Sequence, residues 1–290
     1  MFSGTIVAIV TPFKNGAIDD KAFRDLINYV VAGGVQGIVP CGTTGESATL
    51  THVEHERVID ITVAEVAGRV PVIAGTGSNS TDEAISLTRH AKAAGADAAL
   101  LITPYYNKPT QKGLLAHFTA VAKACDIPLV LYNVPGRTGV NMSAATTIAL
   151  SKIDTIVGVK EASGDVIQIS QIAKGVAPDF DILSGDDGLT LPILAVGGKG
   201  VISVTANVMP AKVSGVVKAW LAGDIAGARR EHLALIDLHN AMFIETNPIP
   251  VKTALALMGK VAEEFKLPLT PMDQANRDKL AAVLTSYGCL

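Results

Sequence analysis

The sequence predicts an α/β protein, a (β/α)8 TIM barrel with a C-terminal helical appendage. Eight short apolar runs rich in β-branched residues recur at intervals of roughly 20–35 residues, as repeated strand–helix units require. Amphipathic stretches lie between these runs, and polar residues collect where the runs end. Parallel strands buried on both faces are apolar nearly throughout, and their alternation with helices is the pattern of a barrel. A doubly wound sheet is the alternative, with fewer units expected.

The eight predicted strands are short, which is typical of strands enclosed by helices. They begin at Thr5 (TIVAIV), Gly37 (GIVP), Val70 (VPVIAG), Ala98 (AALLITP), Pro128 (PLVLYNVP), Thr155 (TIVGVKE), Phe180 (FDILSG) and Gly200 (GVISVTA).

The stretches between the strands carry helical signals. Asp20–Ala32 has apolar residues at helical spacing, and Thr81–Ala94 begins with Thr-Asp-Glu and ends before a glycine. Thr110–Ala122, Ser143–Leu150 and Asp165–Ala173 follow the same pattern.

The strand pattern stops near residue 224, and three further helices are expected. They span Ile225–Asn240, Pro248–Met258 and Asp273–Thr285. We therefore predict a barrel domain over residues 1–224 and a helical domain over residues 225–290.

Composition excludes several classes of protein. The 24 basic and 27 acidic residues give a net charge of -3, which disfavours nucleic-acid binding. A hydrophobic fraction of 49% excludes a disordered chain. No apolar stretch is long enough to span a membrane, and the N-terminus lacks a basic leader. The three cysteines form no CxxC pair, so we expect a reducing, cytoplasmic location.

Lys160 is the most distinctive single residue, because it ends the apolar strand Ile156–Lys160. If its side chain points into the barrel, Val159 and Glu161 point toward the helices. Burial disfavours the charged ammonium, and the neutral amine is a nucleophile that forms Schiff bases with carbonyl compounds. The alternative is a strand-end lysine whose ammonium reaches solvent.

Two other strand ends suit the same chemistry. Tyr132 ends the preceding strand, so its phenol could meet Lys160 and exchange protons with a substrate. Gly42-Thr43-Thr44-Gly45 is a glycine-flanked turn whose backbone N–H groups could hold a carboxylate. The alternatives are a tyrosine packed on the barrel rim and an ordinary tight turn.

Signals for a metal or a nucleotide cofactor are weak. Gly75-Thr76-Gly77 lacks the third glycine of a dinucleotide motif. His52 and His55 have no evident third ligand. Asp186-Asp187 is better explained as two acids capping a helix than as a cation site. We therefore predict no metal.

Seven stretches together resemble one known family. They are GTTGESATL (Gly42–Leu50), PVIAGTG (Pro71–Gly77), TPYYNKP (Thr103–Pro109), YNVPGRTG (Tyr132–Gly139), GVKEASGD (Gly158–Asp165), SGDD (Ser184–Asp187) and NPIPVK (Asn247–Lys252). In this order and spacing they are similar to the dihydrodipicolinate synthase family of pyruvate-dependent class I aldolases. The resemblance covers essentially the whole chain and is weakest near the C-terminus.

The resemblance implies roles for the polar strand ends. Lys160 would form the Schiff base with pyruvate. Tyr132, Thr43 and Tyr106 would relay protons, with Tyr106 crossing from the neighbouring subunit of a tight dimer.

The resemblance also implies a substrate-binding set, and the sequence departs from the family at none of these positions. Thr44 would hold the pyruvate carboxylate through its backbone N–H, together with that of Thr43. Arg137 would receive the carboxylate of L-aspartate 4-semialdehyde, and Gly185 and Ile202 would line the site.

The implied reaction is a Schiff-base aldol condensation of pyruvate with L-aspartate 4-semialdehyde, followed by cyclisation. In the family this is the first committed step of diaminopimelate and L-lysine biosynthesis. The lysine imine supplies the electron sink, so no metal or organic cofactor is expected. The resemblance implies a homotetramer built as a dimer of dimers.

The resemblance further implies feedback inhibition by L-lysine at the tight-dimer interface. The residues that match the family's effector pocket are Ser47, Ala48, His52, His55, Asn79, Glu83 and Tyr105. The carboxylate of Glu83 could pair with an ammonium, while Asn79 and Tyr105 could hydrogen-bond a carboxylate. The alternative is a set of polar residues that merely lines a wet subunit interface.

Two other functions are alternatives to the reaction that the resemblance implies. Another pyruvate aldolase of the same fold, such as N-acetylneuraminate lyase or a keto-deoxy sugar acid aldolase, would retain Lys160 and Tyr132. Arg137 in GRTG and the Thr43-Thr44 pair argue against it. A non-catalytic ligand-binding barrel would need neither Lys160 nor the tyrosines.

Overall fold

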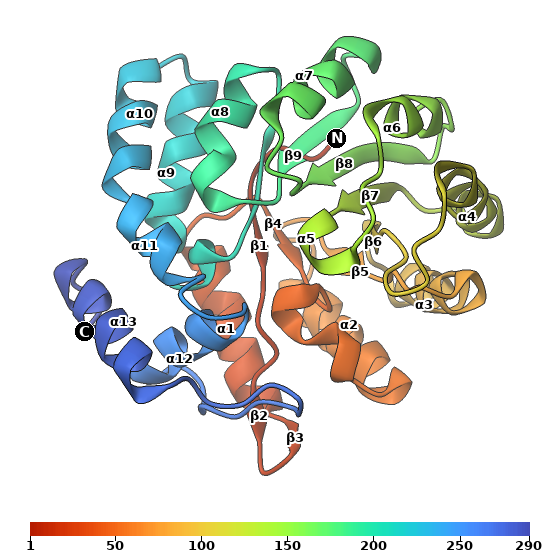
Figure 1. Cartoon of the computed structure of the whole chain (residues 1–290). Helices are drawn as coiled ribbons and strands as arrows, with labels where there is room; N and C mark the ends of the chain where they lie inside the picture. Colours follow the sequence, from red (N-terminus) through yellow and green to blue (C-terminus); the bar gives the residue numbers. More distant parts are fainter.

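Eight parallel strands form the predicted barrel in a computed structural model that describes residues 1–290 (Figure 1). The strands are β1 (Gly4–Ala8), β4 (Gly37–Val39), β5 (Ile73–Gly75), β6 (Ala98–Ile102), β7 (Leu129–Asn133), β8 (Ile156–Glu161), β9 (Asp181–Ser184) and β10 (Gly200–Ser203). The sheet order is β4-β1-β10-β9-β8-β7-β6-β5. A parallel bridge between Ile38 and Val72 joins the two outer strands. The (β/α)8 fold is therefore confirmed.

Alternate side chains of the strands point to opposite faces, which separates the interior of the barrel from the layer under the helices. Ile6 of β1 and Leu183 of β9 belong to a cluster inside the barrel. Their neighbours Val7 and Ile182 pack in the clusters beneath the helices. Residues of opposite parity on one strand therefore meet different environments.

Helices surround the strands (Figure 1). They are α1 (Asp20–Ala32), α2 (His52–Val66), α3 (Thr81–Ala94), α4 (Gln111–Ala124), α5 (Pro135–Thr138), α6 (Ala144–Leu150), α7 (Val166–Gly175), α8 (Thr190–Ala195) and α9 (Pro210–Leu221). Side-chain caps fix several starts: Asp19 accepts from the N–H of Ala22, and Ser80 from that of Glu83.

Four of these helices were not predicted, namely α2, α5, α8 and α9. A short hairpin between β2 (Phe13–Lys14) and β3 (Ala17–Ile18) was not predicted either. Two signals were present. Thr51 and Glu54 form a capping box at the start of α2. Asn15 and Gly16 both have positive φ, which is the Asn-Gly pattern of a tight hairpin turn.

Four helices follow α9, and one expected boundary is wrong. They are α10 (Ile225–Ala234), α11 (Ile236–Ala241), α12 (Ile249–Leu257) and α13 (Gln274–Ser286). The expected helix Ile225–Asn240 is interrupted at Leu235, whose φ of -100° and ψ of -2° end α10. The break sets α11 against the barrel, where Leu238 is buried and His239 hydrogen-bonds Thr205.

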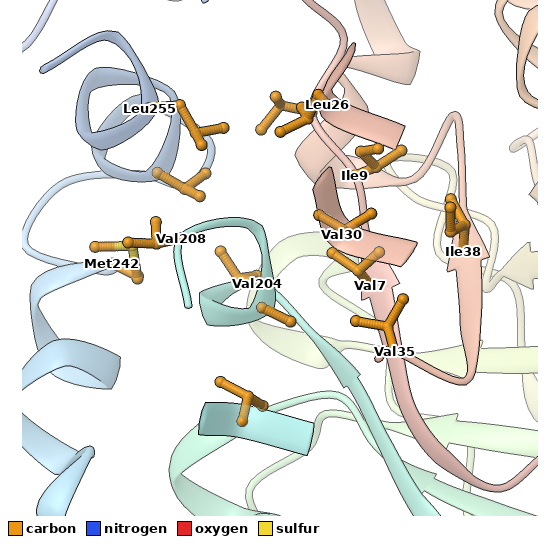
Figure 2. Close-up of a cluster of buried hydrophobic side chains, with 14 of the residues drawn as sticks. Val7, Ile9, Leu26, Val30, Val35, Ile38, Val204, Val208, Met242 and Leu255 are labelled. Atoms are coloured by element: carbon orange, nitrogen blue, oxygen red, sulfur yellow. The ribbon is translucent and has the colours of Figure 1, made fainter. Parts of the chain in front are cut away.

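The C-terminal helices pack directly on the barrel. Figure 2 shows Leu255 of α12 and Met242 in one cluster of buried side chains with Leu26 of α1 and Val208. This packing brings residues from the end of the chain close to the carboxyl ends of β1 and β4.

Candidate active site

Lys160 and Tyr132 lie side by side at the carboxyl ends of β8 and β7. The two residues are paired in the strand register, and the Nζ atom of Lys160 lies 4.2 Å from the centroid of the Tyr132 ring. Each residue is 6% exposed. The ammonium group therefore faces an aromatic ring inside the barrel rather than bulk water.

A cavity of about 140 Å³ opens above this pair. It is lined by Thr43, Thr44, Tyr132, Val134, Arg137, Lys160, Ala162, Gly185, Asp186, Val204, Phe243 and Asn247. Six of the eight residues predicted for catalysis and substrate binding thus lie around one cavity, and Ile202 and Tyr106 do not.

Gly185 leaves the room that the lysine side chain occupies. A Cβ atom at this position would lie 2.6 Å from the Cβ of Ala162 and 3.1 Å from the Cε of Lys160. Any side chain here would displace the lysine or the neighbouring strand.

The turn Gly42–Gly45 contributes two free backbone donors to the cavity wall. Thr43–Gly45 form a short 3₁₀ turn, and the N–H groups of Thr43 and Thr44 donate to no acceptor within the protein. The hydroxyl of Thr44 instead accepts from the Nδ2 of Asn247 at 3.1 Å. The turn can therefore present two N–H groups to a small anion.

Arg137 stands at the rim. It lies in α5, is exposed, and donates from Nη2 to the carbonyl oxygen of Asn247 at 3.0 Å. A guanidinium in this position can bind a carboxylate that enters the cavity from outside.

Ile202 and Tyr106 lie elsewhere. Ile202 is fully buried in the cluster inside the barrel, which also contains Tyr132. Tyr106 is 91% exposed with a φ of 68°, and it projects from the loop after β6. Its phenol does not reach the cavity of its own chain.

The two adjacent acids do not act as a pair of helix caps. Asp186 caps the short turn Asp187–Leu189 by accepting from the N–H of Gly188. Asp187 is buried and accepts from the N–H groups of Val204 and Thr205. These hydrogen bonds support the loop that follows β10. The expectation for Asp187 was wrong.

A second cavity of about 380 Å³ adjoins the first. Thr43, Arg137 and Asn247 line both cavities. The second one contains Ser47, Ala48, His52, His55, Glu83 and Tyr105 from the predicted effector set. Asn79 does not line it, and its carbonyl oxygen accepts from Asn107.

The second cavity is polar on one wall. The Nε2 of His52 lies 2.7 Å from Glu83, which also accepts from the hydroxyl of Ser78. These two contacts hold the pKa of Glu83 below its usual range. Burial lowers the pKa of His55 to about 4, and its Nδ1 has no hydrogen-bond partner.

Sequence reasoning missed Asn247, which contacts both Thr44 and Arg137. Its motif NPIPVK was noticed only as part of the resemblance. No local pattern shows that a residue after α11 returns to the barrel mouth, so only the packing of the C-terminal helices places it there.

No group of three or more His, Cys, Asp and Glu side chains is placed to hold a metal ion. None of the helices combines the length and the apolar character needed to cross a membrane.

The fold and the cavity place the chain among the (β/α)8-barrel enzymes, whose active sites lie at the carboxyl ends of the strands. The sequence profile of the dihydrodipicolinate synthetase family matches residues 1–287. The chain belongs to this family and is a lyase.

Relatives with assigned names are similar to this chain over nearly the whole length of both chains. The 4-hydroxy-tetrahydrodipicolinate synthase of Geobacter sp. (strain M21) is 58% identical over 287 residues, covering 99% of each chain. The crystal structure of dihydrodipicolinate synthase from Aquifex aeolicus is 52% identical, covers 99% of each chain and superimposes with a TM-score of 0.98.

Three further solved relatives differ in what they bind or how they assemble. The Acinetobacter baumannii enzyme, 45% identical with a TM-score of 0.98, is in complex with pyruvate and covers all of both chains. The enzyme of Cyanidioschyzon merolae, 42% identical with a TM-score of 0.97, has lysine bound, and the match covers 100% of this chain and 99% of that one. A monomeric dihydrodipicolinate synthase variant is 41% identical, with a TM-score of 0.98 and coverage of 100% and 98%.

Proposed function

We propose that this chain is a 4-hydroxy-tetrahydrodipicolinate synthase that condenses pyruvate with L-aspartate 4-semialdehyde through an imine at Lys160. The observation that carries the proposal is the buried Lys160 amine, 4.2 Å from the Tyr132 ring in a small cavity. The names of the relatives and the pyruvate complex of one of them support it.

The chemistry begins with attack of the neutral amine on the ketone of pyruvate. Water leaves, and the resulting iminium is an electron sink. Loss of a methyl proton gives an enamine, whose carbon attacks the aldehyde of the second substrate. The amine of that substrate then displaces Lys160 and closes the ring, so the lysine is regenerated without a metal or an organic cofactor.

The surrounding residues supply charge and protons. The N–H groups of Thr43 and Thr44 hold the pyruvate carboxylate, and Arg137 binds the carboxylate of the semialdehyde. Tyr132 and Thr43 pass protons at the reacting carbon. Tyr106 completes this relay from a neighbouring subunit; it is 91% exposed and does not line the cavity of its own chain.

A coupled assay with pyruvate and L-aspartate 4-semialdehyde, run beside cleavage of N-acetylneuraminate, tests the reaction. We expect turnover with the first pair only. Arg137→Ala should weaken use of the semialdehyde and leave trapping of the pyruvate imine largely intact. Preferred turnover of N-acetylneuraminate would contradict the proposal.

We further propose inhibition by L-lysine in the second cavity. Glu83, held at a lowered pKa, is an anionic partner for an ammonium group, and the lysine complex of a relative supports this ligand. Lysine titrations of wild type, Glu83→Ala and Asp82→Ala test it, because Asp82 is adjacent but lies outside the cavity. Inhibition should be lost in Glu83→Ala alone. Wild-type activity unchanged at saturating lysine would contradict the proposal.

The proposed assembly is a homotetramer, a dimer of dimers, in which Tyr106 enters the partner's site. Sedimentation with parallel activity measurements tests it. A fully active monomer would exclude the role of Tyr106 in trans. One of the similar solved chains is a monomeric dihydrodipicolinate synthase variant. A cytoplasmic location stays a prediction.

A further inference from the structure

The end of the Thr43–Gly45 turn has an unusual backbone conformation. Glu46, the residue that ends it, has a φ of 58° and a ψ of 33°, in the left-handed region. A residue with a side chain is uncommon there and persists when its surroundings hold it in place. The contacts of the Glu46 side chain supply that support.

The carboxylate of Glu46 is held entirely by the C-terminal part of the chain. Its Oε1 lies 2.6 Å from the Nζ of Lys252, 206 residues later, and both side chains are fully buried. Its Oε2 accepts from the backbone N–H of Lys266 at 3.0 Å. The ammonium of Lys252 also lies 4.1 Å from the ring centroid of Phe13.

Stability alone is a poor explanation for this ion pair. Removing two charges from water costs as much as the pair regains, and apolar residues of similar size often replace such pairs without loss. Burial lowers the pKa of Lys252 to about 8, although the carboxylate of Glu46 opposes that shift. What an ion pair adds over an apolar contact is a defined geometry for its two partners.

The same C-terminal segment contacts the cavity wall a second time. Asn247 donates from Nδ2 to the hydroxyl of Thr44 and accepts from Arg137. Residues 247–266 thus hold the turn at Thr44 and at Glu46. Thr43 and Thr44, whose N–H groups have no acceptor within the protein, line the cavity beside these two contacts.

We propose that the buried Glu46–Lys252 pair is a positioning device that aims the Thr43 and Thr44 N–H groups at the carboxylate of the substrate. This inference rests on the proposed function, in which that carboxylate belongs to pyruvate. Glu46 and Lys252 touch no substrate and act through the turn. The C-terminal helices are thereby part of the substrate-binding apparatus.

The test removes both charges together, because removing only Lys252 would leave a buried carboxylate unpaired. The variant Glu46→Gln with Lys252→Met keeps side chains of similar size. The matched control is Glu263→Gln with Arg277→Met, which removes a less buried C-terminal pair with an N–O distance of 2.8 Å that does not contact the turn. Thermal unfolding, the KM for pyruvate and kcat are measured for each.

We expect the Glu46/Lys252 variant to unfold near the wild-type temperature and its KM for pyruvate to rise about tenfold, with a smaller change in kcat. The control should keep the wild-type KM. If the double variant does not fold, Glu46→Gln alone is assayed beside the wild type at the same pH, because burial already lowers the pKa of Lys252 and favours its neutral amine once the carboxylate is gone. An unchanged pyruvate KM in whichever variant folds would overturn the inference.

Borohydride trapping of pyruvate on the wild-type enzyme is run alongside. Trapping in the wild type with an unchanged KM in the variants overturns the positioning role and leaves the proposed function standing. A wild type that traps no pyruvate overturns both.

Discussion

Lys160 and Glu161 are neighbours on β8, and both are buried, with exposures of 6% and 1%. Lys160 points into the barrel, where its Nζ meets the ring of Tyr132 and an open cavity. Glu161 points toward the helices, where it accepts from Asn133 at 3.0 Å, Gln168 at 3.1 Å and the N–H of Ser163 at 3.1 Å.

The difference between them lies in hydrogen bonding rather than in burial. Burial raises the pKa of Glu161, and the three donors oppose this shift. A buried polar group whose partners are all protein atoms ties elements together. A buried amine that faces a cavity without such partners remains available for covalent chemistry. Two adjacent residues on one strand can therefore serve structure and reaction separately.

The largest expected effect is on turnover in Lys160→Ala. Without the amine no imine can form, so we expect kcat to fall by about a thousandfold or more. Because the Lys160 amine has no hydrogen-bond partner that its removal would leave unpaired, the free energy of unfolding should change by less than about 1 kcal/mol. A coupled assay and thermal unfolding measure the two quantities. Activity near the wild-type level would remove Lys160 from the mechanism.

Glu161→Ala should show the opposite balance. It removes the acceptor of Ser163 and leaves a hole beneath α7, so we expect a loss of about 3 kcal/mol of stability. Chemical denaturation of this variant beside Lys160→Ala gives the comparison directly. If the two variants were equally stable, Glu161 would contribute no more to the fold than Lys160 does.

His117 extends the comparison to a buried group with one partner. Its Nδ1 lies 2.9 Å from the hydroxyl of Thr81, its Nε2 has no partner, and burial lowers its pKa to about 4. The unfolded chain takes up a proton near pH 6.5 and the folded chain does so only near pH 4. Stability is therefore lost as the pH falls between these values.

Replacing His117 by Gln removes this proton uptake. We expect the acid limb of the stability curve to become shallower, so that the loss of stability between pH 7 and pH 4 falls by roughly 3 kcal/mol. His90, whose side chain is 26% exposed and lies 2.9 Å from Asp60, provides the control substitution His90→Gln. Denaturation midpoints between pH 4 and 7 measure both, and parallel curves for wild type and His117→Gln would contradict the assignment.

The sequence was sufficient to predict that Lys160, on the inner face of β8, lies beside Tyr132. Tyr132 and Lys160 end consecutive apolar strands, so strand pairing alone predicted their proximity. The sequence did not predict the contacts of Asn247, Glu46 and Lys252. These contacts join residues more than 200 positions apart, so they depend on how the C-terminal helices pack on the barrel. The role proposed for Tyr106 depends on a second chain, so it stays a prediction.

The outer face of β8 shows a second limit. The alternation of side chains along a strand was enough to predict that Glu161 points toward the helices. Nothing in the local sequence identified Asn133 and Gln168 as its hydrogen-bond donors. Those contacts depend on the register of β7 with β8 and on where α7 begins.

Reductive trapping shows whether Lys160 forms an imine with pyruvate. Wild-type protein is incubated with pyruvate and borohydride, digested, and its peptides are analysed by mass spectrometry. The imine account predicts a reduced pyruvyl group on the peptide that contains Lys160, and no such group on the peptide with the buried, ion-paired Lys252. Trapping at Lys252, or full inactivation with no adduct at Lys160, would contradict it.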